Sequence, residues 1–173
     1  TTTQPIEAAK NTIDKLRTNQ IKIVIATNPL FPRQAILHRI SWANLLPEKM
    51  AYITSYENSH FSKPHPAYYA EIMANIGWPE QPVGMVGNDW EQDIIPAEIM
   101  GIPTFYIGPT KHISQLSRNA LSENGEFSQV SAWIQRISES NTTSECLAQP
   151  ECYLAILQST AAWFDTISRN DQI

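Results

Sequence analysis

The sequence predicts an α/β protein with a parallel sheet and helices on both faces. Short β-branched runs alternate with segments of helical spacing, and the connections between them are short. Residues 21–27, IKIVIAT, are apolar almost throughout, which is typical of a parallel strand buried on both faces. This alternation indicates βαβ units with right-handed crossovers.

The first half of the core alternates helix and strand from residue 5 onward. Apolar residues recur every three or four positions from Ile6 to Leu16, and Pro5 suits the first turn of a helix. Asn28-Pro29 ends the strand that follows. The predicted elements are a helix over 5–19, a strand over 21–27, a helix over 33–44 and a strand over 51–55.

The second half repeats the same alternation. Pro66 opens a helix that Gly77 ends, and Gly101 stops a shorter helix in the same way. After residue 108 the pattern loosens until apolar spacing returns near 128. The predicted elements are a helix from Pro66, a strand over 83–87, a helix over 91–100, a strand over 103–108 and a helix over 128–137.

Composition narrows the class of protein. The chain is 42% apolar and 17% charged, as in globular proteins, and its net charge of −5 argues against a nucleic-acid partner. No apolar run approaches the roughly 18 residues that a membrane helix needs, and no signal peptide opens the chain. Cys146 and Cys152 either pair or stay reduced, and reduced thiols in the cytoplasm are the simpler interpretation.

Beyond the core the composition changes. We expect residues 1–137 to form the α/β core and the Ser/Thr-rich residues 138–150 to form a linker. Residues 151–173 again have helical spacing, so they predict a C-terminal helix. This helix either docks on the core or begins a second module.

Three polar features stand at or near the ends of predicted strands, where parallel sheets bind ligands. The first is ATNP, residues 26–29, where Thr27 and the backbone at Asn28 suit a phosphate or carboxylate oxygen. A threonine at a strand end also forms turns, so this feature alone leaves both interpretations open.

The second feature is FSKPHP, residues 61–66. Pro64 disfavours the helical region for Lys63, and Pro66 starts the next helix. The lysine is therefore expected in a stiff loop, where its ammonium could neutralise a phosphoryl group or an aspartate. The alternative is a surface lysine in a proline-rich turn.

The third feature is VGNDWEQD, residues 86–93, which directly follows a predicted strand. Asp89 and Asp93 are four residues apart and lie on one side of a helical turn. Carboxylates without sulfur or imidazole ligands suit Mg²⁺. Either aspartate could instead cap the helix, and we favour the metal for the pair.

In this order, the strand-end Thr27, Lys63 and the pair Asp89 and Asp93 resemble three motifs of the haloacid dehalogenase-like hydrolase superfamily. The resemblance covers residues 5–110, and its loops look closest to bacterial phosphatase-like members. It implies a Rossmann-like core and a Mg²⁺-dependent hydrolase that acts on a small phosphorylated substrate through an aspartyl-phosphate. Thr27 and Lys63 would be catalytic, Thr27 and Asn28 would bind substrate, and Asp89 and Asp93 would hold the metal.

One motif of the superfamily is missing from the chain. Its nucleophile lies in an Asp-x-Asp pair on a central strand, but no two aspartates here are two residues apart. The resemblance therefore implies an incomplete core, inactive alone, from the C-terminal part of a longer hydrolase. A missing N-terminal segment or a second chain would complete the sheet. The alternative is a non-catalytic regulatory domain that retains a phosphate and Mg²⁺ site.

Overall fold

Helices and parallel strands alternate in the computed structural model, which describes residues 6–108 and 120–140. The order as far as α3 is α1 (Glu7–Thr18), β1 (Val24–Ile25), α2 (Arg33–Trp42), η1 (Pro47–Lys49), β2 (Tyr52–Ile53), η2 (Tyr56–Asn58) and α3 (Pro66–Asn75). Then come β3 (Met85–Gly87), η3 (Trp90–Ile94), α4 (Ile95–Ile99), β4 (Thr104–Tyr106), β5 (Glu123–Asn124) and α5 (Phe127–Glu139).

The strands form two parallel sheets. β1 pairs with β2, with Val24 opposite Tyr52, and a second sheet has the order β3-β4-β5, with Val86 opposite Phe105. The predicted α/β class with parallel strands is confirmed. Within residues 6–108 and 120–140, β1 and β3 each pair on one side only, so two sheets stand where one was predicted.

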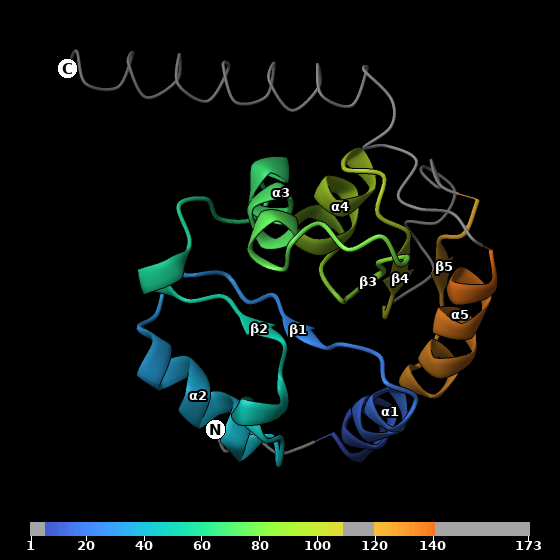
Figure 1. The fold of residues 1–173 in the computed structure, drawn as a ribbon, viewed down its shortest axis with the longest axis horizontal. Coiled ribbons are helices and arrows are strands. Elements are labelled where there is room, and N and C mark those ends of the chain that lie inside the picture. The colour runs from blue at the N-terminus through green and yellow to red at the C-terminus, as the bar shows by residue number, and fades with distance from the viewer. Residues whose placement is uncertain (1–5, 109–119, 141–173) are drawn as a thin grey trace.

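Helices cover both faces of the strand layer, as predicted (Figure 1). α3 and α4 lie on one side, and α1, α2 and α5 lie on the other. Side chains alternate accordingly along β1: Val24 packs with the α3 and α4 cluster, whereas Ile25 packs against α2. Burial on both faces explains why the strand sequences are apolar almost throughout.

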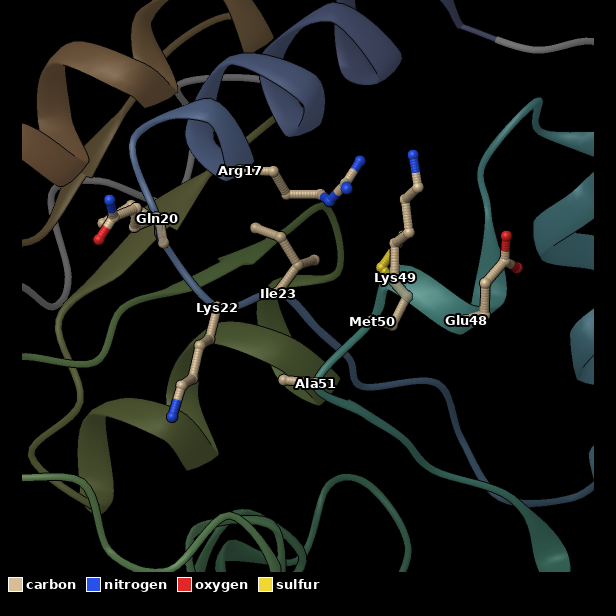
Figure 2. Close-up of a pocket in the computed structure, with 9 residues that line it drawn as sticks. Arg17, Gln20, Lys22, Ile23, Glu48, Lys49, Met50 and Ala51 are labelled. Carbon is tan, nitrogen blue, oxygen red and sulfur yellow. The ribbon is translucent and has the colours of Figure 1, made fainter.

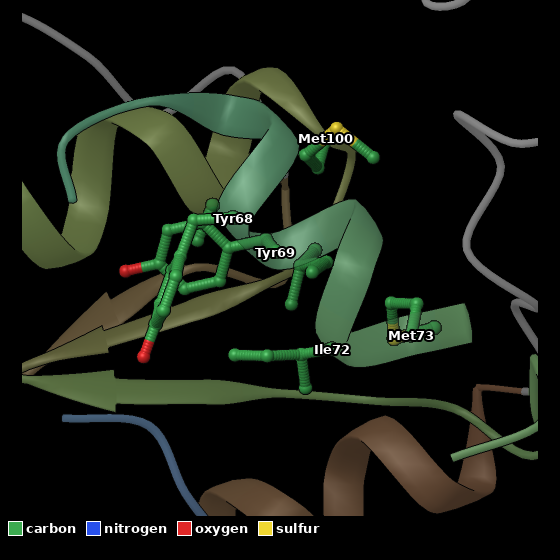
Figure 3. Packing of buried hydrophobic residues seen from close by; sticks show 7 residues of the cluster. Tyr68, Tyr69, Ile72, Met73 and Met100 are labelled. Carbon is green, nitrogen blue, oxygen red and sulfur yellow. The ribbon is translucent and has the colours of Figure 1, made fainter. Parts of the chain in front are cut away.

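The core formed by the described residues consists of three clusters of buried side chains. The α3 cluster, shown in Figure 3, centres on Tyr68, Ile72 and Met100 and extends to both sheets. The α5 cluster joins Trp133 to Phe105 and to α1. The α2 cluster consists of Ile36, Ile40 and Ile53, with Ile25 and other partly buried neighbours packed against it.

Several elements differ in length from the sequence prediction. The strand expected over 21–27 is reduced to Val24–Ile25, because only one of its edges has a partner among the described residues. The helix expected over 91–100 begins as a π-helical turn and continues as α4. β5 was missed because its sequence, Glu-Asn, has no apolar pattern.

Part of the domain prediction falls outside the described residues. The last described helix, α5, ends at Glu139, slightly beyond the predicted residue 137. Most of the expected linker, from residue 141, and the expected helix over 151–173 lie outside the described part of the chain. Among the described helices, none has the length and apolar character needed to cross a membrane.

Candidate active site at the carboxyl ends of β1 and β3

A cavity of about 1100 Å³ lies between the two sheets. Thr27, Asn28, Lys63, Asp89 and Asp93 all line it, although they come from three separate loops. The loops follow β1, precede α3 and follow β3. The structure thus brings together every site residue predicted from the sequence, at the strand ends where ligands bind in parallel sheets.

The backbone of Thr27 is fixed by a buried hydroxyl network. Its N–H donates to Thr54 Oγ1 at 2.9 Å, and its carbonyl accepts from Thr54 Oγ1 and from the Tyr68 hydroxyl, both at 2.7 Å. Burial raises the pKa of Tyr68 well above its usual range, so the phenol stays protonated and can donate. Sequence reasoning missed both partners, although Thr54 lies at the carboxyl end of β2.

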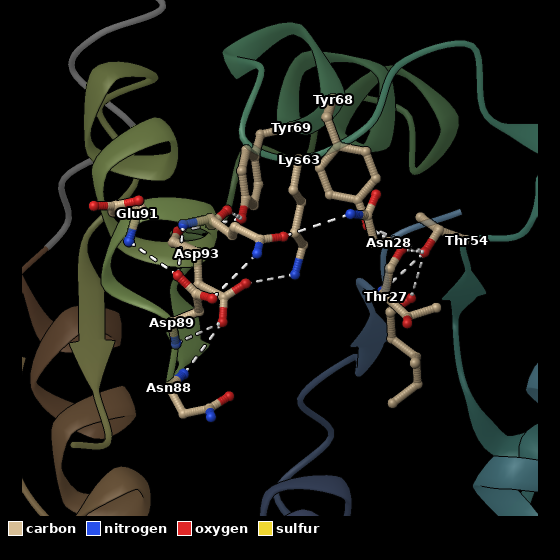
Figure 4. A network of polar contacts seen from close by, with 12 residues as sticks. Thr27, Asn28, Thr54, Lys63, Tyr68, Tyr69, Asn88, Asp89, Glu91 and Asp93 are labelled. Carbon is tan, nitrogen blue, oxygen red and sulfur yellow. Dashed lines mark hydrogen bonds and ion pairs between the residues drawn. The ribbon is translucent and has the colours of Figure 1, made fainter. Parts of the chain in front are cut away.

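The centre of the site is a buried ion pair. Lys63 Nζ lies 2.5 Å from Asp93 Oδ1, and the two side chains are only 8% and 10% exposed. The other carboxylate oxygen of Asp93 accepts from the N–H groups of Asn88 and Asp89, each at 3.2 Å. Figure 4 shows Lys63 pointing toward Asp93, with Thr27 on the far side of the network.

Glycine is required where β3 meets this pair. A Cβ atom at Gly87 would lie 2.3 Å from Asp93 Cβ, which is far inside any real contact. The absent side chain lets η3 fold back so that Asp93 reaches the end of β3. The glycine therefore positions the carboxylate, which explains why the strand ends in Val-Gly-Asn-Asp.

The loop that carries Lys63 is held at both ends, in agreement with the predicted stiff loop. The backbone N–H of His60 donates to both carboxylate oxygens of Glu71, at 3.0 and 2.9 Å, and the N–H of Phe61 donates to one of them at 3.2 Å. At the other end, His65 Nδ1 accepts from the N–H of Ala67 in the first turn of α3. These contacts orient the ammonium group toward Asp93.

Asp89 caps the following helix, which is the alternative to metal binding that the sequence left open. Its Oδ1 accepts from the N–H groups of Glu91 and Gln92, at 3.1 and 3.0 Å, so it caps η3. Its Oδ2 accepts from Gln92 Nε2 at 3.2 Å. The carboxylate is half-buried and lines the cavity.

Asn28 links the two sides of the site. Its Nδ2 donates to Gln92 Oε1 at 3.5 Å, which joins the carboxyl end of β1 to η3. Within the described part of the chain, its Oδ1 is buried without a hydrogen-bond partner. A buried acceptor of this kind carries a desolvation cost until a donor reaches it.

The carboxylate oxygens at this edge are the kind of ligand that a hard cation prefers. Both aspartates line the cavity, and the oxygens of each already accept hydrogen bonds, but Asp89 is the one that is not paired with Lys63. Across 6–108 and 120–140, no three His, Cys, Asp or Glu side chains gather so that they could hold a metal ion. Mg²⁺ binds through one or two carboxylates and keeps several waters, so Asp89 fits it as part of a larger ligand set.

A second cavity, of about 310 Å³, opens at the opposite ends of β1 and β2 (Figure 2). Arg17 and Lys49 extend side by side there, while Lys22 points another way. Arg17 also lies 3.5 Å from Asp14, so part of its charge is already matched. This cavity is at the amino ends of the strands, away from the predicted site residues.

Comparisons with known proteins agree with the fold. An uncharacterized protein from Listeria monocytogenes serotype 4b is similar with a TM-score of 0.60 and 15% identity, over 78% of this chain and 81% of that one. β-Phosphoglucomutase from Clostridium difficile is similar with a TM-score of 0.59 and 14% identity, over 79% of this chain. The chain spans 56% of the length of that enzyme.

Sequence comparison is more specific. No curated protein sequence matches the chain. The sequence model of the haloacid dehalogenase-like hydrolase family, however, matches residues 1–107. This stretch covers well over half of the chain and contains the loops of Thr27, Lys63 and Asp89. The chain therefore belongs to the haloacid dehalogenase-like hydrolase family.

Proposed function

We propose that this chain provides the phosphate- and metal-binding side of a Mg²⁺-dependent phosphatase-type hydrolase. The observation that carries the proposal is the convergence of Thr27, Asn28, Lys63, Asp89 and Asp93 on one cavity at the carboxyl ends of β1 and β3. The similarity to β-phosphoglucomutase, which acts on a sugar phosphate by its name, favours a small phosphorylated substrate. The substrate class points to the cytoplasm as the location.

Each side chain has a role that follows from its contacts. The hydroxyl of Thr27 and the backbone at Asn28 hold phosphoryl oxygens, because the network beneath Thr27 fixes this turn. Lys63 offsets negative charge that develops on the phosphoryl group, as preorganised cations do in such transition states. Asp93 is a positioning residue, since it touches Lys63 and the backbone at Asn88.

Asp89 would hold Mg²⁺, together with waters and ligands beyond the described residues. The ion would supply charge neutralisation for the phosphate oxygens. Asp89 also caps η3, so its carboxylate has a fixed orientation rather than a free rotamer. An aspartate in this position suits a metal that demands near-ideal geometry.

In this proposal the nucleophile is an aspartate of the missing Asp-x-Asp motif. Asp14 lies on α1 beside Lys10, and it does not line the cavity. The incoming carboxylate oxygen bonds to phosphorus while the ester oxygen leaves and takes a proton from a general acid. Water then hydrolyses the aspartyl-phosphate and regenerates the carboxylate, so covalent catalysis divides one difficult step into two.

The test is hydrolysis of p-nitrophenyl phosphate by the full-length gene product with Mg²⁺. We expect Lys63→Met to reduce kcat by about 10²- to 10³-fold, the usual effect of removing one transition-state charge contact. Lys10→Met, on the surface of α1, is the matched control and should retain full activity. Circular dichroism verifies that each variant is folded.

Two results would contradict the proposal. Equal rates for the wild type and Lys63→Met would remove the lysine from the mechanism. A full-length product that hydrolyses none of a panel of phosphomonoesters, yet binds inorganic phosphate at this site, would favour the non-catalytic regulatory alternative.

A further inference from the structure

The cavity at the amino ends of β1 and β2 is lined by a cluster of cations. Arg17, Lys22 and Lys49 line it, and Glu48 is the single carboxylate among the described residues around it. The chain as a whole has a net charge of −5, so its average composition does not predict a positive cluster. A hollow lined by charges of one sign raises the local concentration of ligands of the opposite sign.

Two of these cations act on the same space. Arg17 comes from the last turn of α1, and Lys49 comes from η1. Figure 2 shows their side chains extending side by side, whereas Lys22 points another way and Glu48 stands on the far side of Lys49. Like charges held close together repel each other, so an anion bound between Arg17 and Lys49 would relieve this repulsion.

The neighbouring carboxylates leave much of this charge unmatched. Asp14 Oδ1 lies 3.5 Å from Arg17 Nη1, which is longer than the usual hydrogen bond, whereas Asp14 Oδ2 lies 3.0 Å from Lys10 Nζ. The hydrogen bond from Lys10 lowers the pKa of Asp14, and the charges of Arg17 and Lys49 lower it further, so one carboxylate is shared among three cations. Within the described part of the chain, Lys49 has no carboxylate oxygen within 4.0 Å.

The chemistry of the pair suits a phosphate group. A guanidinium presents a planar fork of donors that matches two phosphate oxygens, and an ammonium adds a compact charge for a third oxygen, which a carboxylate lacks. The apolar side chains of Ile23, Met50 and Ala51 line the same cavity. Its volume of about 310 Å³ is at the lower end of small-molecule sites, so it has room for a phosphate group with a small organic body.

We propose that Arg17 and Lys49 form a second anion site, which binds the dianionic phosphate group of inorganic phosphate or of a small phosphomonoester. The site lies at the opposite end of β1 from Thr27 and is independent of the proposed phosphatase activity. A phosphate bound there joins the end of α1 to η1. It would therefore fasten together the two segments that lead into β1 and β2.

Titration of the full-length gene product with sodium phosphate, followed by heteronuclear NMR at constant ionic strength, tests the site. The amides of Glu48 and Met50 report on it, because these residues line only this cavity. The amides of Asn28 and Asp89 report separately on the phosphoryl site of the proposed function. We expect saturable shifts at Glu48 and Met50 with a Kd of about 1 mM, as two charge-assisted contacts to one phosphate predict.

Two substitutions remove the proposed ligands one at a time. Arg17→Gln and Lys49→Gln should each weaken phosphate binding at the Met50 amide by about tenfold or more. Lys15→Gln is the matched control, because Lys15 is an exposed residue of the same helix that does not line the cavity, and it should weaken binding by about twofold at most. Asp14→Asn should tighten binding, because it removes the carboxylate that competes for Arg17.

Several outcomes would overturn the proposal. An absence of saturable shifts at Met50 would reject the site. Equal shifts with acetate, or equal losses of affinity in Lys15→Gln and Arg17→Gln, would replace it with diffuse charge screening.

The two sources of the phosphate group, and the two proposed sites, are distinguished in the same titrations. Phenylphosphonate, which resists hydrolysis, should bind more tightly than inorganic phosphate if the ligand is an ester, and no more tightly if it is the free ion. Shifts at Met50 without shifts at Asn28 would establish this site and count against the proposed function. The converse result would reject this site and leave the proposed function standing.

Discussion

Replacement of Lys63 by methionine gives the sharpest test of the site as a structural unit. The substitution keeps the length of the side chain but leaves the Asp93 carboxylate, 10% exposed, without its cation. Breaking a buried pair costs about 3–5 kcal/mol. Asp93 retains two backbone donors, at Asn88 and Asp89, so we expect the lower end, about 3 kcal/mol.

Urea unfolding at 25 °C measures this cost. With an m-value of about 2 kcal/mol/M, the midpoint should fall by about 1.5 M. Lys63→Met combined with Asp93→Asn removes the uncompensated charge while keeping an acceptor for the two N–H groups. The double variant should therefore recover more than half of the loss.

Lys10→Met is the control, because Lys10 and Asp14 form a partly exposed surface pair, with side chains 32% and 48% exposed, and its loss should change the urea midpoint little. A midpoint shift for Lys63→Met below about 0.3 M would refute the claim that the pair is buried and coupled. A double variant that is less stable than the single variant would refute the assigned charge penalty.

Three further predictions concern the surroundings of the site. Thr54→Val should lower stability by about 1–3 kcal/mol in thermal unfolding, because the Tyr68 hydroxyl and a buried N–H lose a partner; an unchanged Tm would contradict this. Gly87→Ala should lower the free energy of unfolding by about 1–3 kcal/mol, since Asp93 must move. Gly77→Ala cannot serve as its control, because Gly77 has a φ of +81° and an alanine there would be strained for a different reason. The pKa of Glu57 is lowered chiefly by a backbone N–H at the start of α2. The stability that this carboxylate gives the fold is therefore fully present above the ordinary carboxyl pKa, and it is lost as the pH falls through the lowered pKa of the folded state. The urea midpoints of wild type and Glu57→Gln should therefore differ at pH 7 and converge in acid.

Much of the fold could be predicted because local pattern and tertiary environment agree. The helix around Ile72 has both an apolar face and a proline at its start, and the structure begins α3 at Pro66. Strand extents could not be predicted, since pairing depends on a neighbour that sequence periodicity does not describe. β1 is the example: five of the seven residues over 21–27 are apolar, but only Val24–Ile25 are paired.

The sequence predicted which residues line the candidate site but not which of them contact one another. Thr27, Lys63 and Asp93 were singled out because strand ends converge, and the cavity contains all three. An aspartate was one of the partners expected for Lys63, but the choice of Asp93 had no sequence signal, because the two residues are 30 positions apart. Asp89 illustrates a further limit, since a capping aspartate and a metal-binding aspartate have the same local sequence.

The division of the core into three clusters also affects how the molecule opens. The α3 cluster includes side chains from both sheets, and the α5 cluster joins β3 and β4 to α1 and to the segment ahead of β1. The α2 cluster, in contrast, is confined to α2, β1, β2 and the loops beside them. A unit with few contacts beyond itself can open by subglobal unfolding while the rest stays folded. Amides of Ile36 and Ile40 should then exchange through this local opening, at a lower free energy than amides of the α3 cluster.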